Sequence, residues 1–348
     1  MGENRIILED LEQIVNDRTI PWEKIDGKKI LVTGGTGLIG STLIRALLYR
    51  NIKCQDGPKV LALIRNRKKA DKILKEWIGS EHLVLIEGDV TKPIQISEKP
   101  DYIVHGASQT SSKAFVQEPV ETIRTALMGT GNLLETAAEC KVEGFVYLSS
   151  MEVYGTPETD EKIDEEHGTN LNPVIVRNCY PESKRMCESM CSSYTEEYGV
   201  PAKILRLTQT FGPGVDPEDG RVFAEFARCV KENREIILHT AGETRRSYLY
   251  TGDAVRAILH VLLKGEAGQA YNAANEETYC SIYEMAMMAA EKIAGNRIMV
   301  RCEPEGNLNA FGYAPTLHMN LDTKKLQKLG WTPYYDLETC FRRMLECF

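Results

Sequence analysis

Short apolar runs alternate with stretches of helical periodicity through the first half of the chain. Five runs are typical of strands buried on both faces: KKILVTG (28–34), KVLALIR (59–65), LVLIEGD (83–89), DYIVHGA (101–107) and GFVYLSS (144–150). Helical stretches such as STLIRALLYR (41–50) and VETIRTALMGTGNLLETAAE (120–139) separate them. Apolar strands alternating with helices are typical of a parallel sheet covered on both faces. The pattern therefore predicts an α/β fold of Rossmann type with a doubly wound parallel sheet.

The texture of the sequence changes at two places, which predicts three segments. Residues 1–27 form an N-terminal extension, which is helical because apolar residues such as Ile6, Leu11 and Ile14 recur at helical spacing. Residues 28–205 carry a dinucleotide-binding domain. Residues 206–348 begin with glycine- and proline-rich turns such as FGPGVDPEDG, which indicates a smaller C-terminal α/β lobe for the substrate. We expect some elements of this lobe to interleave with the sheet domain.

Charge and composition restrict the classes of function. The chain has 348 residues, with 50 acidic against 42 basic side chains and a net charge of -8, which repels nucleic acid and anionic membrane surfaces. No apolar run approaches the roughly 20 residues that a membrane span needs, so we expect a soluble cytoplasmic protein. The ten cysteines are scattered without a CxxC pair or a secretory signal, which favours reduced thiols. No metal constellation is visible, and Cys187 and Cys191, at helical spacing, favour packing.

Glycines follow the first predicted strand at the spacing of a dinucleotide fingerprint. Gly34, Gly37 and Gly40 lie between that strand and the helix that follows it. One glycine permits the tight turn, another lets the backbone approach a pyrophosphate, and Gly40 lets helix and strand pack closely, while the helix N-terminus stabilises the anion. We assign Leu38 and Ile39, which stand between these glycines, to the same cofactor site.

The ends of the next three predicted strands add candidate cofactor contacts. NAD-specific sites usually place an acid after the second strand, where it accepts from the ribose hydroxyls, and Arg65 stands there instead. With Arg67 and Lys68 it is suited to a 2'-phosphate, so the pattern favours NADP over NAD; a solvated basic turn is the alternative. The third and fourth strands end in further candidates for the cofactor site: Asp89, Val90, Ala107 and Ser108.

A tyrosine and a lysine in NCYPESKRMCE supply candidate acid-base chemistry. Tyr180 and Lys184 are four residues apart and stand on one face of a predicted helix. A phenol is a base near neutral pH only if its pKa is lowered, and a neighbouring ammonium together with the positive nicotinamide would lower it. We therefore expect both residues to act in catalysis and to contact the cofactor. Elsewhere, we interpret His105 as a core histidine and Asp253 as the cap of the helix that follows it.

Together these motifs resemble the extended short-chain dehydrogenase/reductase family, which includes the nucleotide-sugar epimerases, dehydratases and decarboxylases. The resemblance covers nearly the whole chain from Lys28 onward and rests on TGGTGLIG, GDV, VHGAS, SSMEVYG, YPESK, LRLTQTFGPG, RRSYLYTGDAVRAI, YNAANEE and LDTKKLQKLGWTP. LNPVIVRNCYPESKRMCESMCSSY and QTFGPGVDPEDGRV are most similar to the UDP-glucuronate decarboxylases. The resemblance implies bound NAD or NADP, a nucleotide-activated sugar as substrate, and a homodimer formed by helices near 119–140 and 180–198.

The resemblance also implies roles for single residues. Ser150 matches the hydroxyl that hydrogen-bonds the reacting sugar oxygen, Tyr180 the base that takes its proton, and Lys184 the group that holds the ribose. Glu152 matches an acid that dehydratases use to remove the proton next to the new ketone, which decarboxylases also carry and simple epimerases usually lack. Arg246 matches an arginine implicated in diphosphate binding or proton delivery. The implied substrate site comprises Ser111, Ser150, Gln209, Arg221 and Arg246.

Four positions depart from the pattern of the family. Ser150 replaces a threonine and preserves its hydroxyl. Met151 stands where dehydratases of the dTDP-glucose type carry an aspartic acid that protonates the leaving hydroxyl. Gln209 replaces an asparagine that usually contacts the substrate diphosphate, and Arg65 replaces the NAD-type aspartate.

Three functions follow from these residues. The first is a redox-neutral enzyme that oxidises a sugar carbon transiently, uses the ketone to acidify or decarboxylate its neighbour, and returns the hydride. The second is a net reductase that uses NADPH on a ketone of a sugar or sugar phosphate, which Arg65 favours. The third is a regulator that senses the cofactor, which the presence of both Tyr180 and Lys184 disfavours.

Overall fold

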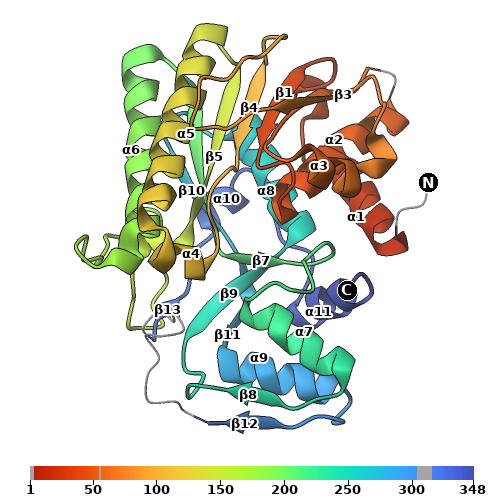
Figure 1. Cartoon of the computed structure of the whole chain (residues 1–348), viewed down its shortest axis with the longest axis vertical. Helices are drawn as coiled ribbons and strands as arrows, with labels where there is room; N and C mark the ends of the chain where they lie inside the picture. The colour runs from red at the N-terminus through yellow and green to blue at the C-terminus, as the bar shows by residue number, and fades with distance from the viewer. Residues whose placement is uncertain (1–3, 55, 304–315) are drawn as a thin grey trace.

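The computed structural model describes residues 4–54, 56–303 and 316–348, and a parallel sheet forms its centre (Figure 1). Seven strands pair in the order β10-β6-β5-β4-β1-β2-β3, and each pair is parallel. Their bounds are β1 Lys29–Thr33, β2 Lys59–Ile64, β3 Leu83–Glu87, β4 Tyr102–His105, β5 Gly144–Ser150, β6 Ala202–Leu207 and β10 Ala270–Ala273. Each of the five apolar runs forms one of these strands, as predicted.

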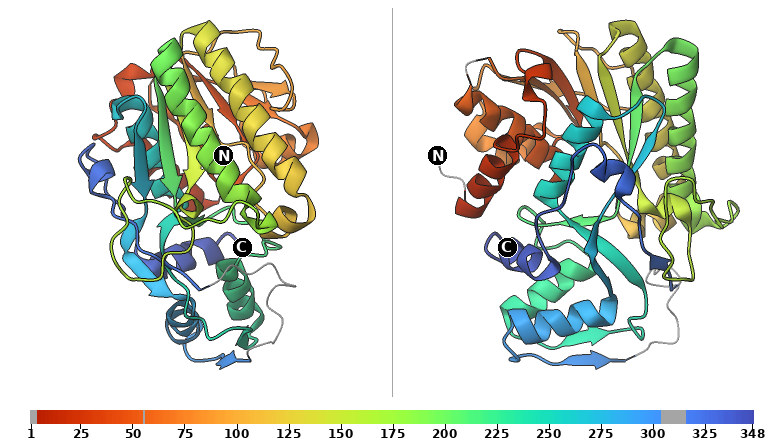
Figure 2. Two further views of the ribbon diagram at one scale, coloured as in Figure 1. Left: turned by 90° about the vertical axis from the view of Figure 1, so that its left-hand side faces the viewer. Right: turned by 180° about the vertical axis from the view of Figure 1, so that it is seen from behind.

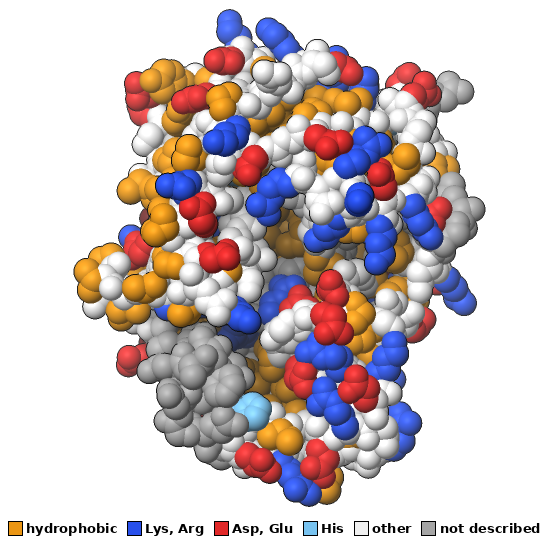
Figure 3. Space-filling view, viewed as in Figure 1, with side chains coloured by type: hydrophobic (Ala, Val, Ile, Leu, Met, Phe, Trp, Pro, Cys, Tyr) orange, Lys and Arg blue, Asp and Glu red, His pale blue; other side chains and the backbone are white. Residues whose placement is uncertain are grey.

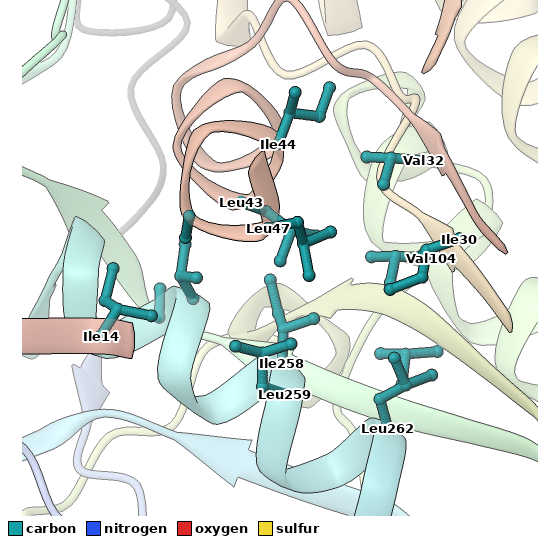
Figure 4. Packing of buried hydrophobic residues seen from close by; sticks show 14 of the residues in the cluster. Ile14, Ile30, Val32, Leu43, Ile44, Leu47, Val104, Ile258, Leu259 and Leu262 are labelled. Carbon is teal, nitrogen blue, oxygen red and sulfur yellow. The ribbon is translucent and has the colours of Figure 1, made fainter. Parts of the chain in front are cut away.

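Helices cover both faces of the sheet, which confirms the Rossmann-type fold. One face carries α2 (Leu38–Lys53) and α8 (Thr251–Lys264), and the other carries α5 (Pro119–Cys140) and α6 (Cys179–Tyr198) (Figures 1 and 2). Figure 4 shows the core of the first face, where Leu47 of α2 and Ile258 of α8 pack near Val104 of β4. Shorter helices lie at the strand ends: α3 Arg67–Ile73, α4 Ser112–Gln117 and the 3-10 helices η1 Trp22–Lys24, η2 Lys75–Trp77, η3 Met151–Tyr154 and η4 Val176–Asn178.

The N-terminal extension forms the predicted helix, α1 (Arg5–Val15), and packs on α2 and α8. Buried charges tie it to later parts of the chain. Asp10 accepts a hydrogen bond of 2.6 Å from the hydroxyl of Tyr250 and pairs at 2.7 Å with Arg343. After the helix, Asp17 pairs at 2.7 Å with Arg256 of α8. The extension therefore bridges the sheet domain and the C-terminal lobe.

The C-terminal lobe is built on a second, smaller sheet (Figure 2). Its central strand β9 pairs with β7, β11 and β13, while β8 and β12 form a separate parallel pair. The bounds of the lobe's elements are β7 Gln209–Phe211, α7 Val222–Glu232, β8 Ile236–Leu238, β9 Arg245–Tyr250, β11 Asn275–Ser281, α9 Ile282–Met288, the π-helix η5 Ala289–Ile293, β12 Val300–Cys302, β13 His318–Met319 and α11 Leu337–Leu345. Helix α10 (Lys324–Gln327) packs on α8 and β10 instead. Between these elements the chain returns to the sheet domain, because α8 and β10 belong to its layers.

The prediction that Asp253 caps the helix after it is wrong. Helix α8 begins at Thr251 without a side-chain cap, and Asp253 lies inside its first turn. The carboxylate instead pairs with Arg256 at 3.0 Å and accepts a hydrogen bond from the backbone amide of Tyr334. Burial raises the pKa of Asp253 to about 6. The residue thus links α8 to the C-terminal segment.

The strand order reverses between β1 and β4, which are neighbours in the sheet although two strands separate them in sequence. In open α/β sheets, ligands bind outside the carboxyl ends of the strands at such a switch point. Figure 3 shows the surface hollowed between the sheet domain and the C-terminal lobe. Among the described residues, no helix combines the length and apolar character that crossing a membrane requires.

Candidate active site

The glycines after β1 lie where the backbone has no room for side chains. Gly34 has a φ of +73°, and a Cβ there would lie 2.8 Å from the carbonyl carbon of Gly106, which follows β4. A Cβ on Gly40 would lie 2.3 Å from the carbonyl oxygen of Gly34. Helix α2 starts at Leu38 with Gly37 as its N-cap and without a side-chain cap, and Gly40 lies in its first turn. Free amides at this helix end fit a pyrophosphate, so the chain is suited to a dinucleotide.

Leu38 and Ile39 form the first turn of α2 and are half-buried, as are Ala107 and Ser108 after β4. The backbone amide of Ala107 donates to Thr33 Oγ1 at 3.1 Å, which holds the end of β4 against the end of β1. The candidate cofactor residues from these two strands therefore lie side by side at the switch point.

The end of β2 is exposed and basic. Arg65 follows the strand directly and is exposed, whereas Arg67 pairs with Asp71 at 2.8 Å within α3. Asp89 follows β3; hydrogen bonds from the amide and hydroxyl of Thr91, and the charge of Arg65, lower its pKa. Val90 beside it is buried. Arg65 and Asp89 thus lie close enough for their charges to interact at the carboxyl edge of the sheet.

His105 is a core residue, as interpreted from its position. Its Nδ1 hydrogen-bonds Thr33 Oγ1 at 2.8 Å and its Nε2 hydrogen-bonds Thr130 Oγ1 at 3.3 Å. Burial, and then the nearby charge of Lys184, lower its pKa to about 3. A neutral imidazole with both nitrogens bonded fixes the ends of β1 and β4.

The candidate catalytic residues converge at the end of β5. Ser150 is the last residue of the strand, and its Oγ accepts from the amide of Glu152 at 3.2 Å. Tyr180 lies in the first turn of α6, and the Ser150 side chain lies close enough to lower the pKa of its phenol. Lys184, one turn later, donates from Nζ to the carbonyl oxygen of Leu148 at 2.6 Å. The helix and the strand thus bring the hydroxyl, phenol and ammonium of the sequence motifs together.

The electrostatics of this group differ in one respect from the expectation. The chain by itself raises the pKa of Tyr180, because burial and the charge of Glu152 outweigh the opposite effects of the Ser150 side chain and of the charges of Arg177 and Arg221. Lys184 lies 5.7 Å from the centre of the Tyr180 ring, and burial lowers the pKa of its own ammonium to about 8. Lowering of the tyrosine's pKa would therefore depend on the positive charge of an oxidised nicotinamide.

Arg177 is a residue of the site that the motifs did not identify. It lies in η4, three residues before Tyr180, and its Nη1 donates to Glu152 Oε2 at 2.7 Å. Phe115 of α4 contacts both Arg177 and Tyr180. Its ring lies 5.2 Å from the Arg177 guanidinium carbon and stacks on the Tyr180 ring with the two ring centroids 4.3 Å apart. The one sequence signal for Arg177 was its place three residues before Tyr180 in VRNCY, within the stretch that is similar to the UDP-glucuronate decarboxylases, and Phe115 had none.

The candidate substrate residues come from both lobes. Gln209 and Arg246 lie on the paired strands β7 and β9, and the Oε1 of Gln209 and the Nε of Arg246 are buried without hydrogen-bond partners among the described residues. Arg221 pairs with Asp219 at 2.6 Å, and its charge reaches Tyr180. Ser111 is exposed at the start of α4. Buried polar atoms without partners on two paired strands are suited to a polar ligand.

The comparisons with known proteins agree with this geometry. The profile of the NAD dependent epimerase/dehydratase family matches residues 30–274. The chain belongs to this family. Within it, the chain is 32% identical over 322 residues to UDP-glucuronic acid decarboxylase 6 of Arabidopsis thaliana, covering 92% of this chain and 88% of the relative. It is 30% identical over 342 residues to human dTDP-D-glucose 4,6-dehydratase, covering 94% and 92%.

A solved family structure has the same fold. UDP-glucose 4-epimerase of Thermus thermophilus, determined as a complex with NAD, superposes with a TM-score of 0.74 at 25% identity, covering 92% of this chain and 98% of the epimerase. The relatives of this epimerase/dehydratase chain are thus NAD-dependent enzymes that act on nucleotide sugars by decarboxylation, dehydration or epimerisation.

Proposed function

We propose that this member of the epimerase/dehydratase family acts on a nucleotide-activated sugar through a transient ketone, without net oxidation or reduction, and that a UDP-linked uronic acid is its substrate. The position of Glu152 carries the proposal. It places a carboxylate next to the Ser150 and Tyr180 hydroxyls, and Arg177 holds it there. A simple epimerase has no step that needs this acid.

The first step falls to the two hydroxyls and the ammonium. Ser150 hydrogen-bonds the sugar C4 oxygen, and Tyr180 takes the proton of that hydroxyl as C4 becomes a ketone. The bound nicotinamide would accept the C4 hydride and give it back at the end. Lys184, tied to Leu148, holds the ribose and keeps the cofactor beside Tyr180. Burial of Tyr180 excludes water from the proton transfer.

The ketone makes the second step possible. In a uronic acid the carboxylate on C5 is β to a C4 ketone, so CO2 leaves and the electron pair remains as an enolate. The enolate takes a proton at C5, for which Glu152 and Arg246 are the candidate groups. Reduction of the C4 ketone, with the Tyr180 proton returned to oxygen, completes a cycle in which the cofactor is unchanged.

Dehydration is less well supported by the residue between Ser150 and Glu152. Met151 is buried at 5% exposure, and the Thr208 hydroxyl contacts its sulfur at 3.2 Å. A thioether cannot protonate a leaving hydroxyl. Loss of water would need an acid that this position does not supply, whereas loss of CO2 needs none.

The proposal is tested by offering the purified protein UDP-glucuronate, UDP-glucose and dTDP-glucose with catalytic amounts of NAD or NADP, and in separate reactions with NADPH. We expect UDP-glucuronate to yield CO2 and a UDP-pentose, with the absorbance of reduced nicotinamide returning to its starting value. Release of water from a hexose substrate would show that the enzyme catalyses dehydration and not decarboxylation. NADPH consumed in proportion to product would remove the redox-neutral function altogether.

Arg65 favours a second candidate, a reductase that uses NADPH. It is exposed at the end of β2, where an NAD-specific enzyme needs an acid, and a guanidinium is suited to a 2'-phosphate. We propose NADP as the cofactor on the same ground. In a direct binding titration, Arg65→Asp should lose affinity for NADP and gain affinity for NAD. Equal effects on both cofactors would contradict this preference.

We also propose a homodimer formed through α5 and α6. Both helices expose apolar side chains, which Figure 3 shows along the edge of the molecule. The most exposed are Val120, Ile123 and Met128 on α5 and Met186 and Tyr198 on α6. Ile123→Glu should yield monomers in light scattering, while Ile237→Glu in β8, equally exposed, should not. A monomeric unmodified protein would contradict the proposal.

A cytoplasmic location is proposed from the thiols. All ten cysteines are free, and Cys187 packs in the core with a hydrogen bond from Thr130. Free buried thiols fit a reducing compartment. Fractionation of the native cells tests this, and recovery of the protein outside the cytoplasm would contradict it.

A further inference from the structure

The ion pair between Glu152 and Arg177 joins two segments that lie 25 residues apart in the sequence. Glu152 lies in the turn after β5 and Arg177 in η4, and their side chains are 30% and 20% exposed. The Nη1 to Oε2 distance is 2.7 Å, and Arg177 makes no other side-chain ion pair among the described residues. Its Nε is buried without a hydrogen-bond partner in the same part of the chain. The carboxylate of Glu152 is therefore the one anionic partner of this guanidinium among the described residues.

An aromatic ring fixes the guanidinium from below. Phe115 is 1% exposed and lies 5.2 Å from the guanidinium carbon. The same ring stacks on Tyr180 with an interplanar angle of 9°. Because a packed ring allows little movement, Phe115 fixes the positions of Arg177 and Tyr180 relative to each other. The ion pair with Arg177 then fixes the position of Glu152 relative to both.

We infer that Arg177 is a positioning residue that holds the Glu152 carboxylate in place for the step after sugar oxidation. The inference rests on the proposed function, because it assigns Arg177 to the step in which Glu152 takes part. A carboxylate alone in the site would also repel an acidic sugar, and the guanidinium cancels that charge. Ser150 and Tyr180 carry out the first oxidation without Glu152. Loss of Arg177 should therefore stall the reaction after the ketone has formed.

The test uses four variants of the full-length protein, Arg177→Gln, Arg177→Lys, Arg177→Ala and Arg185→Gln, each with bound cofactor and UDP-glucuronate as substrate. Arg177→Gln removes the guanidinium, and Arg177→Lys keeps the charge that also lowers the pKa of Tyr180 but loses the planar reach. Arg185→Gln is the matched control, because it removes an arginine of an exposed ion pair with Glu182 on α6, one turn beyond Tyr180. Stopped-flow absorbance follows reduced nicotinamide, and product analysis follows turnover.

We expect Arg177→Gln to slow nicotinamide reduction only modestly, through the charge lost near Tyr180, and then to stall, with turnover down about a hundred-fold, as for a misplaced catalytic group. Arg177→Lys should stall less, added guanidinium should partly restore Arg177→Ala, and Arg185→Gln should behave as the unmodified protein. If Arg177→Gln and Arg177→Lys slow nicotinamide reduction as much as turnover, the inference is wrong. If the unmodified protein neither reduces its cofactor nor forms product with any nucleotide sugar, the proposed function itself fails.

Discussion

The ammonium of Lys184 donates to the backbone carbonyl of Leu148 at 2.6 Å, so the charge of the YxxxK motif is buried against the sheet. Burial lowers its pKa from 10.5 to about 8. This shift corresponds to about 3 kcal/mol of cost to the folded protein at neutral pH. Replacing Lys184 would remove this cost, but it would also lose the hydrogen bond to Leu148, which lowers the gain in stability by about 1 kcal/mol.

Lys184→Met should therefore stabilise the cofactor-free protein by about 2 kcal/mol at pH 7 and abolish turnover. Lys203 on β6 is the matched control, since burial lowers its pKa to about 8 as well and it lies outside the candidate site. Lys203→Met should raise the melting temperature without loss of turnover. A Lys184→Met protein that melts below the unmodified one would contradict the cost assigned to this charge.

The same shift predicts how stability depends on pH. Lys184 has a lower pKa folded than unfolded, so between pH 8 and 10.5 the unfolded chain binds more protons and the contribution of Lys184 to stability rises with pH. The advantage of Lys184→Met is largest below pH 8 and shrinks toward pH 10.5. Melting curves of both proteins across this range measure it, and a difference independent of pH would show another cause.

Gly34→Ala should destabilise the protein and weaken cofactor binding. The new Cβ would lie 2.8 Å from the Gly106 backbone, at a φ of +73° that alanine rarely adopts. We expect a loss of about 2 to 4 kcal/mol in stability. Gly168→Ala, where a Cβ meets nothing within 4 Å, is the control. Titration with NADP and NAD and thermal melting measure the two effects, and normal affinity for both cofactors in Gly34→Ala would argue against this turn as the pyrophosphate site.

Asp17→Asn should weaken the attachment of the N-terminal extension. Asp17 and Arg256 are each 2% exposed, and removing the charge of Asp17 leaves the buried guanidinium with Asp253 as its one carboxylate partner among the described residues. Breaking such a pair costs about 3 to 5 kcal/mol. Arg5→Ala removes an exposed pair on the preceding helix and should cost almost nothing. Urea unfolding compares the two, and equal losses would mean that burial of the pair is unimportant.

The sheet and its carboxyl edge could be predicted from the sequence, because strands buried on both faces are apolar throughout and their ends need glycine, serine or other small residues. Tyr180 and Lys184 could also be predicted as site residues, because their spacing is set by one turn of helix. The ion pair of Glu152 with Arg177 and the contact of Arg177 with Phe115 could not be predicted. Both depend on how a loop of over twenty residues returns to the site. The role of Asp253 was missed for a related reason, since its partner Tyr334 comes from the far end of the chain.

The most direct test of a transient ketone is the fate of the hydrogen on the reacting carbon. UDP-glucuronate with deuterium at C4 is mixed with an equal amount of unlabelled UDP-glucuronate, and the protein turns both over with a trace of cofactor. We expect the label to stay at C4 of the UDP-pentose, in the molecules that carried it at the start. Label in free reduced cofactor, or product formed only as NADPH is consumed, would contradict the redox-neutral cycle.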